Sequence, residues 1–122
     1  MTADLGPSFA GRYILLVEDE YFIAEDLMHT LQASGASVVG PAARIDDALD
    51  LIEGTDRLDA AVIDINLHGD LVYPVADALI DRGVPFVFAT GYDEASIPAR
   101  YAGFTRCEKP VDPSTIATAL FG

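Results

Sequence analysis

The chain has 122 residues, the size of one domain, and 51% of them are hydrophobic, which is enough for a buried core. Its 7 basic and 20 acidic residues give a formal net charge of -13, which argues against nucleic acid or an anionic membrane as a direct partner because both require a basic face. A single cysteine, Cys107, excludes an internal disulfide and no apolar run is long enough to cross a bilayer, so we expect a cytoplasmic protein.

The first residues, 1–11, lack the charged start and apolar core of a signal peptide, and we expect them to form a flexible tail before one domain over residues 12–122. Within that domain, continuous apolar runs predict strands covered on both faces, and apolar residues that recur every three or four positions predict amphipathic helices. We expect strands at 13–17, 37–40, 58–64, 84–89 and 104–107. Between them we expect a helix at 20–32 with Ile23, Leu27 and Leu31 on its apolar face, a helix around 45–52 and a helix from Pro74 to just before Gly83. A last helix is expected to begin at Asp112 and Pro113, with Ile116 and Leu120 pointing inward.

Two connections are predicted to be irregular. Residues 65–73, which read INLHGDLVY, are expected to form a loop after the third strand. Residues 93–101 have a helical pattern that Pro98 interrupts, so a helix there is expected to be short or irregular. Five strands that alternate with helical segments predict an α/β fold, a doubly wound parallel sheet with helices on both faces and its site at the carboxyl ends of the strands.

Polar residues stand where four of these strands end. Glu18 and Asp19 follow the first strand, Asp64 closes the third, Thr90 follows the fourth and Lys109 follows the fifth. Because neighbouring strands lie about 4.8 Å apart, carboxylates at the ends of adjacent strands crowd together and raise one another's pKa. A hard divalent cation such as Mg²⁺, which prefers oxygen ligands, removes that cost. The pattern therefore predicts a cation pocket at this edge of the sheet.

This constellation resembles the receiver domains of bacterial response regulators, because the acidic pair, the aspartate, the hydroxyl and the Lys109–Pro110 pair occur in that family's order and spacing. The resemblance covers about residues 12–121. It implies one (βα)5 domain of flavodoxin-like strand order 2-1-3-4-5. It also implies the function of a single-domain response regulator, in which Asp64 accepts a phosphoryl group from a sensor histidine kinase or a phosphotransfer protein.

The resemblance also implies a role for each site residue. Asp19 and Asp64 would bind Mg²⁺ through their side chains, Asn66 through its backbone carbonyl, and Glu18 through water. Lys109 and Thr90 would contact the phosphoryl group with an ammonium and a hydroxyl. The bond between Lys109 and the following proline is expected to be cis, as it commonly is in the family.

Residues 88–92 read FATGY, which resembles the motif of a receiver subgroup with many stand-alone members, often paired with kinases of the HWE type. Gly91 would let its backbone amide approach the phosphoryl group, unless it is an ordinary turn glycine. Phosphorylation is expected to change the surface between Thr90 and Arg106, which a downstream protein reads. Because the sequence ends just after the last expected helix, we expect no DNA-binding or catalytic output domain in it.

Two positions depart from the family pattern. Arg106 stands where receivers usually have an aromatic switch residue, and Tyr92 either replaces that residue or only packs on its loop. His68 stands where many receivers have proline. It is either a plain loop residue or one that tunes cation or proton chemistry.

Three other functions are weighed against a phosphorylated receiver. A pseudoreceiver would bind a partner without phosphorylation, but the complete set of site residues argues against it. A phosphatase similar to the haloacid dehalogenases needs a second aspartate two residues after the nucleophile, where Asn66 stands instead. A flavodoxin-like nucleotide binder needs a glycine-rich phosphate loop after the first strand, and here that position is acidic.

Overall fold

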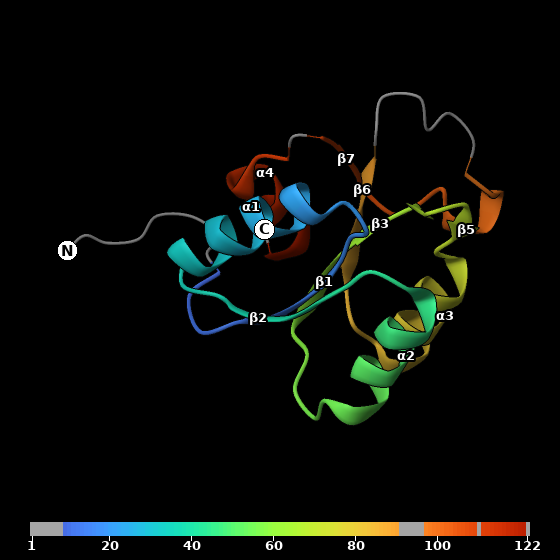
Figure 1. The fold of residues 1–122 in the computed structure, drawn as a ribbon, viewed down its shortest axis with the longest axis horizontal. Coiled ribbons are helices and arrows are strands. Elements are labelled where there is room, and N and C mark those ends of the chain that lie inside the picture. The colour runs from blue at the N-terminus through green and yellow to red at the C-terminus, as the bar shows by residue number, and fades with distance from the viewer. Residues whose placement is uncertain (1–8, 91–96, 110, 122) are drawn as a thin grey trace.

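The computed structural model describes residues 9–90, 97–109 and 111–121, and the statements below refer to these residues. Their centre is a five-stranded parallel sheet in the order β2-β1-β3-β6-β7 (Figure 1). Counted along the chain within this sheet, the order is 2-1-3-4-5, which confirms the expected flavodoxin-like fold. The strands are β1 (Tyr13–Val17), β2 (Ser37–Ala42), β3 (Ala60–Asp64), β6 (Phe86–Thr90) and β7 (Arg106–Glu108).

Helices cover both faces of the sheet, with α1 and α4 on one face and α2 and α3 on the other (Figure 1). Successive strand side chains point to opposite faces, so each face buries its own apolar layer. Leu15 and Ile63 face α2 and α3, whereas Leu16 and Val62 face α1 and α4. The helices are α1 (Tyr21–Ala33), α2 (Ile45–Gly54), α3 (Tyr73–Arg82) and α4 (Pro113–Phe121). No helix in the described ranges is long and apolar enough to span a membrane.

The structure differs from the sequence-based expectation for α1. Ile23 is 39% exposed, whereas Ala24, Leu27 and Leu31 are buried, so the apolar face of α1 is centred away from Ile23. The expectation for α3 is confirmed, because Pro74 lies in its first turn and Gly83 ends it with a left-handed backbone, φ 75°.

The predicted loop at 65–73 contains a short antiparallel hairpin of β4 (Asn66–Leu67) and β5 (Asp70–Leu71). His68 and Gly69 form its turn, with φ values of 51° and 94°. A two-residue hairpin turn of the type I′ class requires positive φ at both central residues. The hairpin follows β3 directly and therefore lies at the same edge of the sheet as Asp64.

The end of the expected N-terminal tail belongs to the folded domain. Residues 1–8 lie outside the described part of the chain, but Phe9 is only 2% exposed and its ring centroid is 5.8 Å from that of Phe121. The Gly11 amide donates to the carbonyl oxygen of Gly35 at 3.0 Å. A Cβ on Gly35 would lie 2.8 Å from the Cα of Ala10, so this close packing requires glycine.

The described part of the β6–β7 connection is irregular, as the sequence predicts, with one 3-10 turn at Ala99–Tyr101 that follows Pro98. Tyr101 is 1% exposed and stacks on Tyr73, with ring centroids 4.7 Å apart. Its hydroxyl donates to the Asp77 carboxylate at 2.6 Å. These contacts fasten the connection to α3.

Candidate functional site

The carboxyl ends of β1, β3, β6 and β7 lie at one edge of the sheet, and they carry the predicted site residues. The register pairs Asp64 on β3 with Ala89 on β6, and Thr90 on β6 with Glu108 on β7. Thr90 is 6% exposed, and its carbonyl oxygen accepts a 2.8 Å hydrogen bond from the Lys109 amide. Parallel pairing thus brings residues that are far apart in the sequence to one place.

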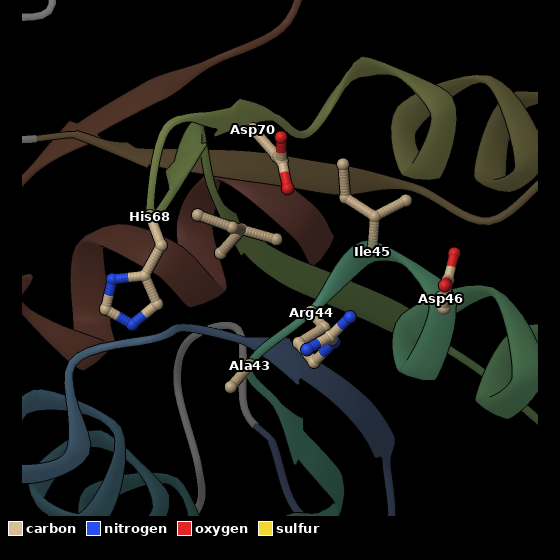
Figure 2. Close-up of a pocket in the computed structure, with 7 residues that line it drawn as sticks. Ala43, Arg44, Ile45, Asp46, His68 and Asp70 are labelled. Carbon is tan, nitrogen blue, oxygen red and sulfur yellow. The ribbon is translucent and has the colours of Figure 1, made fainter.

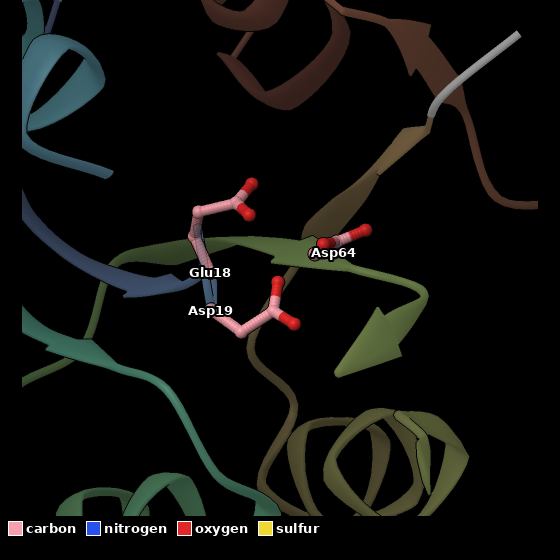
Figure 3. Close-up of side chains that lie close together, drawn as sticks. All are labelled: Glu18, Asp19 and Asp64. Carbon is pink, nitrogen blue, oxygen red and sulfur yellow. The ribbon is translucent and has the colours of Figure 1, made fainter. Parts of the chain in front are cut away.

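Three carboxylates form an acidic cluster at this edge (Figure 3). Glu18, Asp19 and Asp64 each place a carboxylate oxygen within 4.8 Å of the others. Glu18 and Asp64 are 3% and 5% exposed, so their charges are largely removed from solvent. Buried carboxylates this close repel one another unless a cation lies among them. An all-oxygen donor set of this kind fits Mg²⁺ or Ca²⁺.

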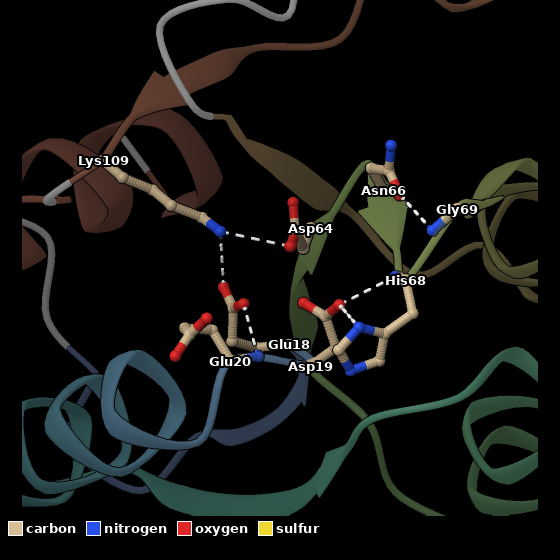
Figure 4. Close-up of polar contacts among 8 residues, drawn as sticks. All are labelled: Glu18, Asp19, Glu20, Asp64, Asn66, His68, Gly69 and Lys109. Carbon is tan, nitrogen blue, oxygen red and sulfur yellow. Dashed lines mark hydrogen bonds and ion pairs between the residues drawn. The ribbon is translucent and has the colours of Figure 1, made fainter.

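Lys109 reaches the cluster from the end of β7 (Figure 4). Its Nζ lies 2.7 Å from Glu18 Oε1 and 3.1 Å from Asp64 Oδ2, and its side chain is 18% exposed. The other Glu18 oxygen, Oε2, accepts the Glu20 amide at 3.0 Å. Lys109 is therefore not a solvated surface lysine.

Burial and the neighbouring charges shift the pKa values of Glu18, Asp64 and Lys109. Burial raises the pKa of Glu18 to about 6, against the lowering effect of its hydrogen bonds to Lys109 and Glu20. Burial also raises the pKa of Asp64, although the charge of Lys109 lowers it. For Lys109 burial lowers the pKa, but the two carboxylates outweigh it and the net shift is upward. The ammonium stays charged, and the cluster keeps an excess of negative charge that a divalent cation would neutralise.

Asp19 is held by the hairpin rather than by Lys109 (Figure 4). The His68 amide donates to Asp19 Oδ2 at 2.8 Å, and the His68 Nδ1 lies 3.2 Å from the same oxygen. The turn itself is fastened by the Gly69 amide, which donates to the Asn66 side-chain oxygen at 2.7 Å. A backbone hydrogen bond from Asn66 also lowers the pKa of Asp64.

The structure thus brings together Glu18, Asp19, Asp64, Thr90 and Lys109, as the sequence predicts. Three predicted features lie outside the described residues, namely the Gly91 amide, the Tyr92 switch candidate and the cis bond to the proline at position 110.

Sequence reasoning missed two sets of side-chain contacts, one at the acidic cluster and one between the β6–β7 connection and α3. It did not place His68 on Asp19, although a His-Gly pair between two short apolar stretches resembles the Asn-Gly signal of a hairpin. It also missed the network of Tyr101, Arg100 and Asp77, in which the Arg100 guanidinium lies 2.6 Å from the Asp77 carboxylate. No periodic pattern marks residues that pair across 24 positions.

No protein-family model matches the chain, and no curated protein matches it in sequence. Solved structures do match. SdrG from Sphingomonas melonis Fr1 is 38% identical, with 89% of this chain and 92% of that chain covered and a TM-score of 0.79. The BeF3-activated conformation of SdrG from Pseudomonas melonis Fr1 is 37% identical, with 87% and 91% covered and a TM-score of 0.72.

A more distant match is a response regulator protein from Burkholderia pseudomallei whose structure contains a phosphorylated aspartic acid, a calcium ion and citrate. It is 27% identical, with 89% of this chain and 66% of that chain covered and a TM-score of 0.72. The fold, the acidic site and the likeness to SdrG all indicate the same family. The chain belongs to the response regulator receiver domains.

Proposed function

We propose that the chain is a phosphorylation-dependent signalling module in which Asp64 is the phosphoacceptor. The contact of Lys109 carries this proposal, because one ammonium lies 2.7 Å from Glu18 and 3.1 Å from Asp64 within a buried acidic cluster. Two of the similar structures support it. SdrG has a BeF3-activated conformation, and the Burkholderia pseudomallei response regulator holds a phosphorylated aspartic acid.

In the proposed reaction a carboxylate oxygen of Asp64 attacks the phosphorus of a phosphohistidine on a sensor kinase or a phosphotransfer protein. The new P–O bond forms as the P–N bond breaks, and the donor imidazole leaves with the bonding electron pair. Such transfers pass through a loose transition state, so positioning and charge neutralisation supply most of the acceleration. Lys109 neutralises charge on the phosphoryl oxygens, and Thr90 offers a hydroxyl donor at the end of β6.

Mg²⁺ fits the acidic cluster on the chemistry of its donors, which are all oxygen atoms and carry more negative charge than Lys109 balances. Glu18, Asp19 and Asp64 would hold the ion, with the backbone carbonyl of Asn66 as a further ligand. When bound, the ion supplies positive charge beside the transferred phosphoryl group. The protein's own contribution is to keep Asp64 buried, oriented and next to Lys109.

We infer further that this is a stand-alone receiver of the FATGY subgroup, which receives its phosphoryl group from a kinase of the HWE type. The FATGY sequence at 88–92 supports this inference. The output surface would be the segment between Thr90 and Arg106, whose described part is fastened to α3 through Tyr101 and Asp77. A downstream protein would read the change in this segment after Asp64 is phosphorylated.

Labelling with a small phosphodonor tests the proposal. Wild-type protein incubated with acetyl phosphate and Mg²⁺ should gain the mass of one phosphoryl group, and Asp64→Asn should gain none. The matched control is Asp81→Asn, which changes an exposed carboxylate on α3 and should be labelled like the wild type. Undiminished labelling of Asp64→Asn would show that another residue is the acceptor. A folded wild-type protein that is never labelled would support the pseudoreceiver alternative.

A further inference from the structure

His68 has an unusual backbone for a residue with a side chain, and it contacts a member of the acidic cluster. Its φ of 51° lies in the left-handed region, which non-glycine residues seldom adopt. The β4–β5 pairing and the bond from Gly69 to the Asn66 side chain maintain this conformation. The turn therefore holds His68 at one place at the end of β3.

Two nitrogen atoms of His68 lie close to one oxygen of Asp19. The backbone amide lies 2.8 Å from Asp19 Oδ2 and the imidazole Nδ1 lies 3.2 Å from it. The Asp19 side chain is only 12% exposed, whereas that of His68 is 77% exposed. The contact thus joins a nearly buried carboxylate to a ring that reaches the surface.

Asp19 needs such a partner more than the other two carboxylates do. Lys109 bonds Glu18 and Asp64, whereas in the described part of the chain Asp19 is paired with His68. Two like charges lie within 4.8 Å of Asp19, and their repulsion favours turning its carboxylate away from them. The amide hydrogen bond and the adjacent imidazole hold Oδ2 in place, which opposes that rotation and leaves Oδ1 for a cation.

We propose that His68 is a positioning residue that fixes the Asp19 carboxylate in the orientation that binds the divalent cation. The inference rests on the proposed function of the acidic cluster as a cation site. It assigns the imidazole a definite form, with the proton on Nδ1 so that this atom donates to Asp19. The backbone amide contributes the second donor, whatever side chain occupies position 68, provided that it is not proline.

The solvent exposure of the His68 imidazole determines how strongly it can influence cation binding. His68 also lines a hollow of about 180 Å³ between the start of α2 and the hairpin, together with Arg44, Ile45 and Leu67 (Figure 2). Water therefore reaches the imidazole and weakens its bond to Asp19. Buried partners of metal ligands change metal affinity by about 10–100-fold, so we expect a smaller change, about three- to tenfold, from this exposed one.

A pair of variants distinguishes the contribution of the His68 side-chain donor from that of the turn's backbone conformation. Asparagine and glycine both tolerate the left-handed backbone, but only asparagine places a donor nitrogen, Nδ2, where the imidazole has Nδ1. In calorimetric titrations with Mg²⁺ at pH 8, His68→Gly should bind about three- to tenfold more weakly than the wild type. His68→Asn should bind within about twofold of the wild type. The Gly69 amide resonance reports whether the hairpin is intact in each variant.

Equal Mg²⁺ affinity of His68→Gly and the wild type would overturn the proposal, and so would His68→Asn binding as weakly as His68→Gly. A second readout needs no metal. The chain has 2 histidines, so His29→Asn, a change on the exposed surface of α1, leaves the ring of His68 as the only imidazole. Its ¹⁵N shifts at pH 8 should show the proton on Nδ1, and a proton on Nε2 would refute the assigned hydrogen bond.

These two readouts distinguish this inference from the proposed function. If the wild type binds no Mg²⁺, the cation site itself is wrong. If Mg²⁺ binds but the two variants do not differ, only the role of His68 is wrong.

Discussion

Replacing Lys109 with methionine should destabilise the metal-free protein more at pH 7 than at pH 5. At an effective dielectric constant of about 20, unit charges at 2.7 and 3.1 Å attract by about 5–6 kcal/mol each. Desolvation offsets much of this attraction, and removing one partner of a buried ion pair costs about 3–5 kcal/mol, because the remaining charge is left unpaired.

Protonation of Glu18 limits the cost of removing Lys109. Burial already raises the pKa of Glu18 to about 6, and loss of the Lys109 charge raises it further. A carboxyl group with a raised folded-state pKa stabilises the fold at low pH, and that stabilisation is lost as pH rises through the raised value. We therefore expect Lys109→Met to lose about 2–3 kcal/mol of unfolding free energy at pH 7 and about 1 kcal/mol at pH 5.

Urea denaturation of the metal-free proteins at the two pH values measures this difference. The matched control is the double variant Glu18→Gln/Lys109→Met, which removes one of the two carboxylates that Lys109 leaves unpaired and should recover part of the loss at pH 7. A penalty that is equal at both pH values, or one that Glu18→Gln does not reduce at all, would refute the view that Lys109 neutralises two buried carboxylates.

Two further predictions concern the metal and the β6–β7 connection. Because the folded protein holds a proton on Glu18 between pH 4.5 and about 6, metal-free stability should fall by about 2 kcal/mol as pH rises through that window. Mg²⁺ should therefore raise the urea midpoint more at pH 7 than at pH 5, and an equal rise would contradict this linkage. Tyr101→Phe removes the 2.6 Å bond to Asp77 and should cost about 1–2 kcal/mol in the same assay. Tyr21→Phe, at a side chain that is 66% exposed, is the control, and an equal cost in both variants would show that the Asp77 bond contributes nothing.

The sheet and its site were predictable because they depend on simple patterns. β1, β3 and β6 are buried along nearly their whole length, so their sequences are continuous apolar runs that end at polar residues. The carboxyl ends of parallel strands meet at one edge, which was sufficient to place Asp64 near Asp19. The likeness to receivers supplied the strand order and the role of Lys109, which composition and spacing alone do not fix.

The parts that sequence reasoning missed depend on packing that leaves no periodic signal. Ile23 fits the helical repeat but is 39% exposed, because the sheet lies under Ala24, Leu27 and Leu31. Phe9 is isolated among small residues in the sequence, but in the structure it is buried and contacts Phe121.

Short elements also leave too little sequence signal to be predicted. β4 and β5 have 2 residues each, too few for an alternating pattern to be recognised. The bond from His68 to Asp19 joins residues 49 positions apart through a turn. Such contacts follow from the three-dimensional position of the hairpin, which a local sequence pattern does not encode.

Beryllofluoride, which mimics a phosphoryl group on a carboxylate, provides the most direct test of a phosphoacceptor beside a cation site. Amide NMR spectra should be compared for the metal-free protein, the protein with Mg²⁺, and the protein with Mg²⁺ and beryllofluoride. Mg²⁺ alone should shift amides near Asp19 and Asp64, and beryllofluoride should add shifts at Thr90 and Lys109 that extend toward Tyr101. Unchanged spectra, or shifts confined to the opposite edge of the sheet, would contradict the proposed site.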